Sequence, residues 1–464
     1  MTATTRLGLA LGCALLPLAA AAQTAPTLAV LKGLAPVTVL SKSAAGRAAL
    51  GANYAVTGGL QTGALRQPTL LPFAAQQQQA LRDAFITDGD LAELADGLGT
   101  TLGAAYGARA HYTDREHYTN VSPALADLIA YTNAVTGSDS NAGKYFFANA
   151  TTDGKAPVSE EAGAILKANG GAPDPFGRAY GRPAGSPGAD AYGDSRPFQT
   201  EPGVLPIVGP DYFNVPASND VYNRGPISNL VDSPSYPSGH TTYGYMGTIL
   251  LAVLVPERYP ALIARGAEYG NDRILMGAHY AMDVLGGRTL ATYDLAHLLA
   301  NDPAYMNRSV KDFAAPMAMG QARREVPPIA DYRAAVAAAR AELASALSAG
   351  CGDSVEACAA QDIGRFADPA ASAAFYGTTQ TYGLPTVWPE RAGTTEDVGR
   401  LAPEAGYLLT VAFPSLTLEQ ADAILTATEG PGGGFLDDGS AFGVYSRLDL
   451  QAAATRAAAL AKGR

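Results

Sequence analysis

Apolar side chains recur at helical spacing along much of the chain. In the segment 76–98 they stand at Leu81, Phe85, Leu91, Leu94 and Leu98, which predicts one amphipathic helix. The same reasoning predicts further helices over 123–135, 239–254, 257–269, 279–300 and 330–347. No strand pattern competes with them, so we expect an all-α protein.

Two stretches lack a helical period. Residues 23–74 carry weakly patterned Ala, Gly, Thr and Leu and are interpreted as an N-terminal arm that packs on the helices after it. Residues 168–226 are rich in Gly, Pro, Asp and Tyr, which predicts a long functional loop inside an insertion spanning 150–226. A proline-containing stretch near 316–328 indicates a boundary, after which 319–464 is predicted to be a helical accessory domain.

The N-terminus has the pattern of a secretory signal. Arg6 precedes an apolar run from Leu7 to Leu18, and Ala20–Ala22 before Gln23 fits a cleavage site. We therefore expect a signal peptide over 1–22 and a periplasmic or secreted protein, the alternative being a buried N-terminal helix. No other apolar stretch has the length of a membrane span.

The chain has three cysteines, and Cys13 lies within the predicted signal. Cys351 and Cys358 remain, and in an oxidising compartment they are expected to form a disulfide. Two cysteines seven apart on one helix could not be bridged, so Cys351 is expected in the loop before a helix that begins near 353. No Cys/His cluster has zinc-ligand spacing.

Composition narrows the classes of partner. Only 16% of residues are charged and the formal net charge is −11, whereas 47% are apolar. An acidic surface argues against nucleic acid as a partner. Any phosphate site must be a local basic pocket, which makes each Lys or Arg near a motif informative. Oligomeric state is left open by the sequence.

A first candidate site is the segment Pro237-Ser238-Gly239-His240, which opens the predicted helix 239–254. Ser238 is a suitable N-cap, and the unpaired N–H groups at a helix start bind anions. Gly239 allows the backbone to approach a ligand, and His240 is placed to exchange a proton. The alternative is an ordinary capped helix with a surface histidine.

A second candidate site is Arg273-Ile-Leu-Met-Gly-Ala-His279-Tyr-Ala-Met-Asp283. On a helix, His279 and Asp283 would share a face, so the carboxylate could hold one ring nitrogen and leave the other free as a nucleophile or ligand. Arg273 lies on the approach to that helix and could reach an anion bound at His279. The alternative is a structural His–Asp pair beside a surface arginine.

Taken together, the two segments resemble the second and third signature motifs of the type 2 phosphatidic acid phosphatase superfamily. That superfamily includes bacterial class A non-specific acid phosphatases, lipid phosphatases and vanadium haloperoxidases. The resemblance is strong over 230–295 and extends over about 75–320. It implies a helical bundle of that type, with the domain at 75–318.

The superfamily's first motif, Lys-x6-Arg-Pro, is interrupted here. Lys144-Tyr-Phe-Phe resembles its start, but the expected Arg-Pro does not follow. Arg196-Pro197 resembles the displaced end, and Arg182-Pro183 is a rival. A further departure is Asp272, where the family commonly has Ser before the Arg.

The resemblance implies a two-step phosphoryl transfer. His279 attacks phosphorus and forms a phosphohistidine, and Asp283 orients its ring. His240 protonates the leaving alcohol and later deprotonates the water that releases phosphate. His279 must be neutral and His240 protonated, so opposed pKa shifts and a mildly acidic optimum are expected.

The same resemblance assigns the phosphate-binding groups. Lys144, Arg196 and Arg273 would bind the phosphate oxygens, and Ser238 and the Gly239 N–H would add hydrogen bonds. These cations would replace metal ions, so no metal or other cofactor is expected.

The sequence therefore predicts an exported, metal-independent acid phosphatase that acts on small phosphate monoesters and releases inorganic phosphate. One alternative is a vanadium-dependent haloperoxidase that holds vanadate in the same pocket. A second is a non-catalytic phosphate-binding or cell-surface protein. The other histidines, His111, His117 and His297, are interpreted as surface or packing residues.

Overall fold

A computed structural model describes residues 25–85, 89–115, 117–146, 159–169, 194–201, 203–231, 233–313 and 324–463. The predicted signal peptide over 1–22 and the rival Arg182 lie outside the described residues.

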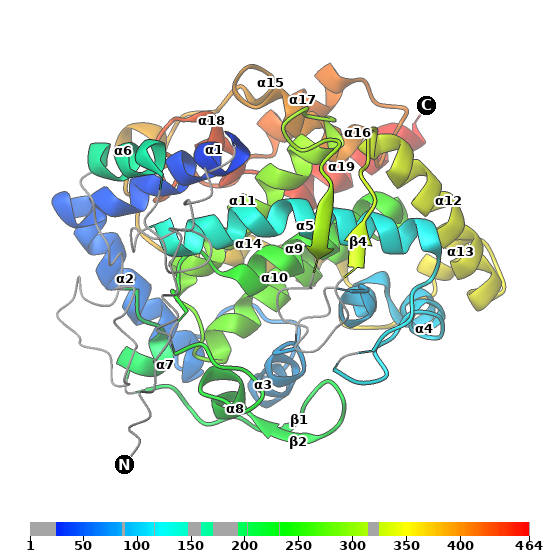
Figure 1. Cartoon of the computed structure of the whole chain (residues 1–464), viewed down its shortest axis with the longest axis horizontal. Helices are drawn as coiled ribbons and strands as arrows, with labels where there is room; N and C mark the ends of the chain where they lie inside the picture. The colour runs from blue at the N-terminus through cyan, green and yellow to red at the C-terminus, as the bar shows by residue number, and fades with distance from the viewer. Residues whose placement is uncertain are drawn as a thin grey trace, which may run out of the picture.

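Four long helices form the centre of the molecule (Figure 1). They are α5 (Pro123–Phe146), α9 (Gly239–Leu254), α10 (Tyr259–Leu275) and α11 (Ala281–Leu299). Helix α9 packs against both α10 and α11, and nearly all of its residues are buried. A helix that is apolar all round fits this central place. The helices predicted from apolar spacing at 239–254 and 279–300 are confirmed within two residues, whereas the helix predicted over 257–269 continues to Leu275 as α10.

The N-terminal region is more helical than its weak periodicity indicated. Its elements are α1 (Ala25–Leu34), η1 (Ala35–Lys42), α2 (Ala44–Gln61), α3 (Phe73–Arg82), η2 (Ala92–Leu98) and α4 (Thr100–Gly107). Helix α1 packs on α5, and α2 contacts α10 and α11.

The single helix predicted over 76–98 is wrong. Helix α3 ends at Arg82, and η2 begins only at Ala92. Asp83 turns its carboxylate into the protein to bind the guanidinium of Arg265, and the Asp90 carboxylate accepts a hydrogen bond from the Ala92 N–H at 2.7 Å. A side chain that bonds the backbone two residues on favours a turn over a helix.

The predicted insertion contains short regular elements as well as loops. They are α6 (Glu160–Ala168), α7 (Pro197–Thr200), β1 (Val208–Pro210), β2 (Pro216–Ser218) and α8 (Asn219–Asn223). β1 pairs antiparallel with β2, with Val208 opposite Ser218. A second ribbon joins β3 (Val310–Phe313) to β4 (Arg324–Val326). Apart from these ribbons and two isolated β-bridges, the regular elements of the described residues are helices, which confirms the all-α class.

The C-terminal region consists of helices that pack on the central ones. They are α12 (Tyr332–Cys351), α13 (Val355–Ala359), α14 (Pro369–Thr379), η5 (Pro389–Arg391), α15 (Val398–Leu401), η6 (Pro403–Gly406), α16 (Tyr407–Thr410), α17 (Leu418–Ala427), α18 (Ala441–Tyr445) and α19 (Leu450–Lys462). α12 packs on α4 and α5, and α14 and α19 pack on α10. Thr417 and Gln420 form a capping box at the start of α17. A domain boundary near 319 stays a prediction.

One apolar core runs through both regions. It includes Leu250 of α9, Leu343 of α12 and Leu409 of α16. Arg288 of α11 also donates to the carbonyl oxygens of Thr379, Gln380 and Ser446 at 3.0 to 3.2 Å. The C-terminal helices therefore share the core of the helices that carry the candidate motifs.

Cys351 and Cys358 form the predicted disulfide, with their Cα atoms 6.4 Å apart. Cys351 is the last residue of α12 and not a loop residue as expected. Gly352, with φ of 82°, ends that helix in the left-handed conformation and so turns the chain towards α13.

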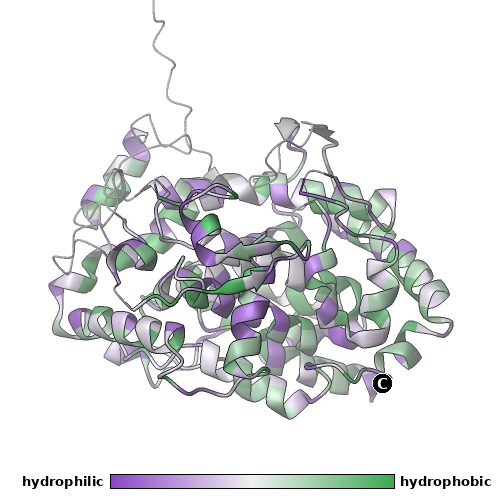
Figure 2. Cartoon of the chain, turned by 90° about the horizontal axis from the view of Figure 1, so that it is seen from below, coloured by the Kyte–Doolittle hydropathy of each residue, from purple (hydrophilic) through white to green (hydrophobic). Residues whose placement is uncertain are grey.

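Hydrophobic and hydrophilic residues are mixed along most helices (Figure 2). Among the described residues, no single helix combines the length and apolar character needed to cross a membrane. One helix pair, Pro26–Lys42 with Ala44–Gln61, reaches both limits only when taken together, and it is bent by 99°.

The shared core predicts that a cavity in the C-terminal region destabilises the whole protein. Leu343 is fully buried, so Leu343→Ala is expected to lower the free energy of unfolding by about 2–5 kcal/mol. Leu460 is 40% exposed, and Leu460→Ala should change it by less than about 0.5 kcal/mol. Chemical denaturation should show one transition, shifted in the first variant. A separate early transition for the C-terminal helices would contradict the shared core.

Candidate active site

His279 lies in the tight connection between α10 and α11. Gly277 has φ of 72°, and a Cβ there would come within 2.6 Å of a Val204 methyl carbon, so glycine is required at this turn. The His279 N–H donates to the Arg273 carbonyl at 3.3 Å, which folds the connection back on α10. His279 precedes α11, so the expectation that it shares a helical face with Asp283 is wrong.

Asp283 reaches His279 because it caps its own helix. Its Oδ2 accepts a hydrogen bond from the Tyr280 N–H at 2.9 Å, from His279 Nδ1 at 3.2 Å, and from the Ser235 hydroxyl. Burial raises the pKa of Asp283 to about 7, against these hydrogen bonds and nearby cations. Donors converging on one oxygen fit the carboxylate form. His279 Nδ1 then carries the proton, and Nε2 presents its lone pair.

Arg196 faces this lone pair. Its Nη1 donates to His279 Nε2 at 3.0 Å and to the Ala278 carbonyl at 2.9 Å. Its Nε and Nη2 donate to the carbonyl oxygens of Ser233 and Pro234 at 2.7 and 2.8 Å, and Nη2 also bonds Ser233 Oγ at 3.2 Å. All five guanidinium N–H groups are thus engaged and the side chain is held rigid. An oxyanion at Nε2 would take the place of the histidine as acceptor from Nη1.

Lys144, at the end of α5, meets Arg196 at a shared hydroxyl. Lys144 Nζ donates to Ser233 Oγ at 3.0 Å. A Cβ added at Gly239 would lie 3.5 Å from Lys144 Cε, so the glycine leaves this side of the site open. Burial and the charge of Arg196 lower the pKa of Lys144 to about 7. Both halves of the interrupted first motif therefore meet beside His279.

Arg273 supplies a third buried cation. Its side chain is 1% exposed, and its Nη1 bonds the Asp83 carbonyl at 3.4 Å. Its Nε is buried without a hydrogen-bond partner among the described residues. Burial lowers its pKa. A buried guanidinium with an unused donor is suited to an anionic ligand.

Helix α9 begins at the site, as predicted. Ser238 caps it by accepting from the Thr241 N–H at 3.2 Å, and the Ser238 N–H donates to the Asp283 carbonyl at 3.0 Å. The ring centroids of His240 and His279 are 6.5 Å apart. These bonds tie the start of α9 to the start of α11.

The two histidines do not show the opposed pKa shifts expected from the sequence. Burial, and then the charges of Arg273, Lys144 and Arg196, lower the pKa of His240 well below its usual value. Burial and the same cations also lower the pKa of His279. Without an anion in the site, both imidazoles are therefore neutral.

The predicted site residues in the described part of the chain come together, and the other histidines have separate partners. His117 pairs with Asp114 at the surface, and His297 pairs with Asp302 at 2.7 Å. No group of three or more His, Cys, Asp or Glu side chains in the described residues has the geometry of a metal site.

Several supporting residues were missed by sequence reasoning. Ser233 and Ser235 bind Lys144, Arg196 and Asp283, and their place just before Pro237 was a usable signal. Residues of α2 gave no signal, because their partners on α11 are more than two hundred positions away. Asn53 and Thr57 accept hydrogen bonds from the N–H groups of Met282 and Ala281 at 3.0 and 3.1 Å.

Comparison with known proteins agrees with this geometry. Residues 190–302, which contain Arg196, both histidines and Asp283, match the model of the PAP2 superfamily. The resemblance drawn from the motifs is thereby confirmed for this part of the chain.

Individual relatives are bacterial phosphatases. The chain is 44% identical over 71 residues to a non-specific acid phosphatase of Salmonella typhimurium, covering 15% of this chain and 28% of that protein. It is 42% identical over 64 residues to an acid phosphatase of Zymomonas mobilis, covering 14% and 24%. It is 37% identical over 72 residues to a non-specific acid phosphatase of Providencia stuartii, covering 16% and 29%. The chain thus matches less than a third of each relative's length.

The lowered pKa of Lys144 predicts pH-dependent anion binding. Lys144 loses its proton as pH rises through about 7, so affinity for an oxyanion should fall over that range. Sulfate is the suitable probe, because its own charge does not change near neutral pH, and calorimetric titration gives the affinity. In Lys144→Arg the dependence should be smaller, because arginine stays charged, and what remains reports Asp283, whose pKa is raised to about 7. A sulfate affinity independent of pH in the wild type would contradict this assignment.

Proposed function

We propose that the protein is an acid phosphatase that hydrolyses phosphate monoesters through a phosphohistidine on His279. The observation that carries the proposal is the placement of the His279 ring, whose Nδ1 lies 3.2 Å from Asp283 and whose Nε2 lies 3.0 Å from Arg196 Nη1, a group that can only donate. The PAP2 match and the acid phosphatase relatives support it.

In the first step, His279 Nε2 attacks phosphorus and an N–P bond forms as the P–O ester bond breaks. The ester oxygen leaves as an alcohol after taking a proton from His240, whose ring lies on the side of α9. The Asp283 carboxylate stabilises the positive imidazole ring that results.

In the second step, water attacks the phosphohistidine, and His240 accepts a proton from that water. The N–P bond breaks, inorganic phosphate leaves, and His279 returns to its neutral form. His240 then gives this proton to the departing phosphate, which leaves as the monoanion, and the site returns to its neutral resting form.

Substrate binding supplies the proton that the neutral resting site lacks. A phosphate ester loses its second proton near pH 6 at its usual pKa, so at mildly acidic pH it can arrive as a monoanion. Its negative charge also opposes the cations that lower the pKa of His240. This coupling favours turnover on the acidic side of neutrality.

The three cations account for transition-state stabilisation without a metal ion. Lys144, Arg196 and Arg273 surround the position beyond His279 Nε2, and the start of α9 adds backbone N–H groups. Fixed positive charge in a buried site stabilises the charge on a transferring phosphoryl group. Small phosphorylated compounds are the proposed substrates.

Export to the periplasm or beyond is part of the proposal. The signal-like segment over 1–22 and the disulfide between Cys351 and Cys358 support it.

The decisive experiment is hydrolysis of p-nitrophenyl phosphate in the presence of EDTA. We expect metal-independent turnover, and a loss of about 10⁴-fold or more in kcat for His279→Ala, the size typical for removal of a nucleophile. The matched control is His117→Ala, because the His117 ring is exposed and pairs with Asp114 at the surface. Its turnover should equal that of the wild type.

Other outcomes of this experiment would support a different function. No turnover in a wild type that binds phosphate would contradict the phosphatase. Peroxide-dependent bromide oxidation after addition of vanadate would then point to the haloperoxidase, and its absence would point to a binding protein.

A second prediction concerns the acidic limb of the pH profile. The attacking form of His279 is neutral and its pKa is lowered, so kcat/KM should fall only at a pH well below the ordinary histidine value of 6.5. Arg196 is the charge that lowers this pKa most. Arg196→Gln should therefore move the limb upwards as well as reduce the rate. An acidic limb at or above pH 6.5 in the wild type would contradict the assignment.

A further inference from the structure

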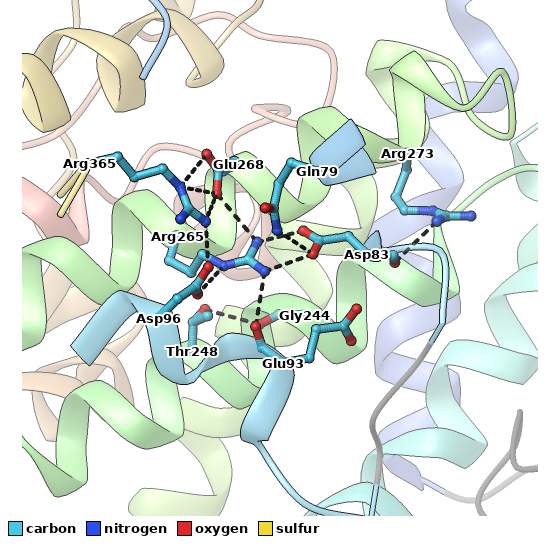
Figure 3. A network of polar contacts seen from close by, with 10 residues as sticks. All are labelled: Gln79, Asp83, Glu93, Asp96, Gly244, Thr248, Arg265, Glu268, Arg273 and Arg365. Atoms are coloured by element: carbon cyan, nitrogen blue, oxygen red, sulfur yellow. Dashed lines mark hydrogen bonds and ion pairs between the residues drawn. The ribbon is translucent and has the colours of Figure 1, made fainter. Parts of the chain in front are cut away.

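A buried network of ion pairs lies beside Arg273 (Figure 3). At its centre is Arg265 of α10, whose side chain is fully buried. Its terminal nitrogens bind both carboxylate oxygens of Asp83 at 2.6 and 2.9 Å, and its Nε binds Asp96 at 2.6 Å.

The network ends in the C-terminal region at Arg365. Arg365 Nη2 binds Glu268 at 2.6 Å and Asp96 at 2.5 Å, and its Nε binds Glu268 at 2.9 Å. Glu268 also lies 3.6 Å from Arg265. Two guanidinium groups therefore share three carboxylates, and one of the two comes from outside the segment that matches the PAP2 family.

Asp83 joins this network to the proposed phosphate site. Its carboxylate binds Arg265, and its carbonyl oxygen accepts from Arg273 Nη1 at 3.4 Å. Asp272 lies next to Asp83, and burial and the Asp83 charge raise the pKa of Asp272 well above its usual value. This raised pKa favours the neutral form of the Asp272 carboxyl, and a neutral group beside Arg273 does not oppose its positive charge.

Two kinds of partner compete for Arg273, a nearby carboxylate and the proposed phosphoryl group. A buried guanidinium close to a carboxylate gains most by forming an ion pair with it. Such a pair would use the donors and cancel the charge that a phosphoryl group needs. In the structure, the Asp83 carboxylate binds Arg265 on both oxygens, and among the described residues the hydrogen bond of Arg273 goes to the Asp83 carbonyl.

We propose that Arg265 and Arg365 are positioning residues, which together with Asp96 and Glu268 hold the Asp83 carboxylate away from Arg273, so that Arg273 stays available for the phosphoryl group. The inference rests on the proposed phosphate site but not on turnover. It assigns the C-terminal region a part in anion binding, acting through α10.

Charge balance sets the expected effect of each substitution. The three carboxylates exceed the two network guanidinium groups by one negative charge. Arg365→Gln raises the excess to two, and Arg265 is then drawn towards Glu268 and Asp96. Asp83 becomes free to pair with Arg273. Adding Asp83→Asn removes one carboxylate and restores the original excess.

The experiment measures binding of inorganic phosphate to the full chain by calorimetric titration at one acidic pH. Arg365→Gln should weaken binding by about tenfold, a size typical of coupling within one ionic network. Arg365→Lys should recover most of the affinity, because it keeps the charge. The double variant Arg365→Gln with Asp83→Asn should bind more tightly than Arg365→Gln alone. If turnover is present, KM should rise with the phosphate Kd while kcat changes little.

The matched control is Arg258→Gln. Arg258 pairs with Asp362, three residues before Arg365, so it ties the same C-terminal segment to the residues that precede α10. It has no bond to the network in the described residues, and its loss should leave phosphate affinity unchanged. Equal weakening in this control would overturn the proposal in favour of general loosening of the segment.

A variant with the opposite expected effect on phosphate affinity keeps the proposal testable if Arg365→Gln misfolds. The Asp96 side chain is 35% exposed, so Asp96→Asn is a mild change, and it should tighten phosphate binding by about twofold. Unchanged affinity in both Asp96→Asn and Arg365→Gln, or no recovery in the double variant, would overturn the proposal. If phosphate binding follows these expectations but the protein shows no turnover, the positioning role of Arg265 and Arg365 is supported and only the phosphatase activity is rejected.

Discussion

The burial of three positive side chains beside a neutral histidine is the interaction on which the rest of the site depends. Lys144, Arg196 and Arg273 lie together in an interior where charge is poorly solvated. Their hydrogen bonds run to neutral acceptors, and apart from His279 Nε2 these acceptors are oxygen atoms. Arg196 bonds backbone carbonyls and a serine hydroxyl, Lys144 bonds the same hydroxyl, and Arg273 bonds one carbonyl. The cations therefore keep their charge for a ligand.

This arrangement explains why so much of the chain converges on one point. A backbone carbonyl stays beside a buried cation only if other contacts fix the position of the segment that carries it. The segment before α9 is held by the bond between Ser238 and Asp283. The start of α11 is held by Asn53 and Thr57 of α2. The C-terminal helices α14 and α19 pack on α10. The extra regions thus contribute rigidity to a site that they do not themselves line.

The sequence allowed prediction of the residues that form the candidate site and of the helices that carry them, because those signals are local. The cap at Ser238 and the apolar run behind it predicted α9 to the residue. Asp83 shows why the rest was out of reach. Apolar spacing continued through it, and only its distant partner Arg265 explains why the helix ends there. Arg196 was found through its motif, but its engagement of His279 depends on Ser233 and on chain paths that no local pattern encodes.

Asp272 illustrates how a departure from a family pattern can be accommodated. The superfamily commonly has a serine there, a neutral group that can donate a hydrogen bond. A carboxyl next to the charged Asp83 is held in its protonated form, and a protonated carboxyl is also a neutral donor. Burial is the first cause of this raised pKa, and the neighbouring Asp83 carboxylate is the second. Arg265 binds both oxygens of Asp83 and so fixes the position of that carboxylate beside Asp272. The acid at 272 is therefore tolerated through its burial, and the ionic network adds to the effect by placing Asp83 next to it.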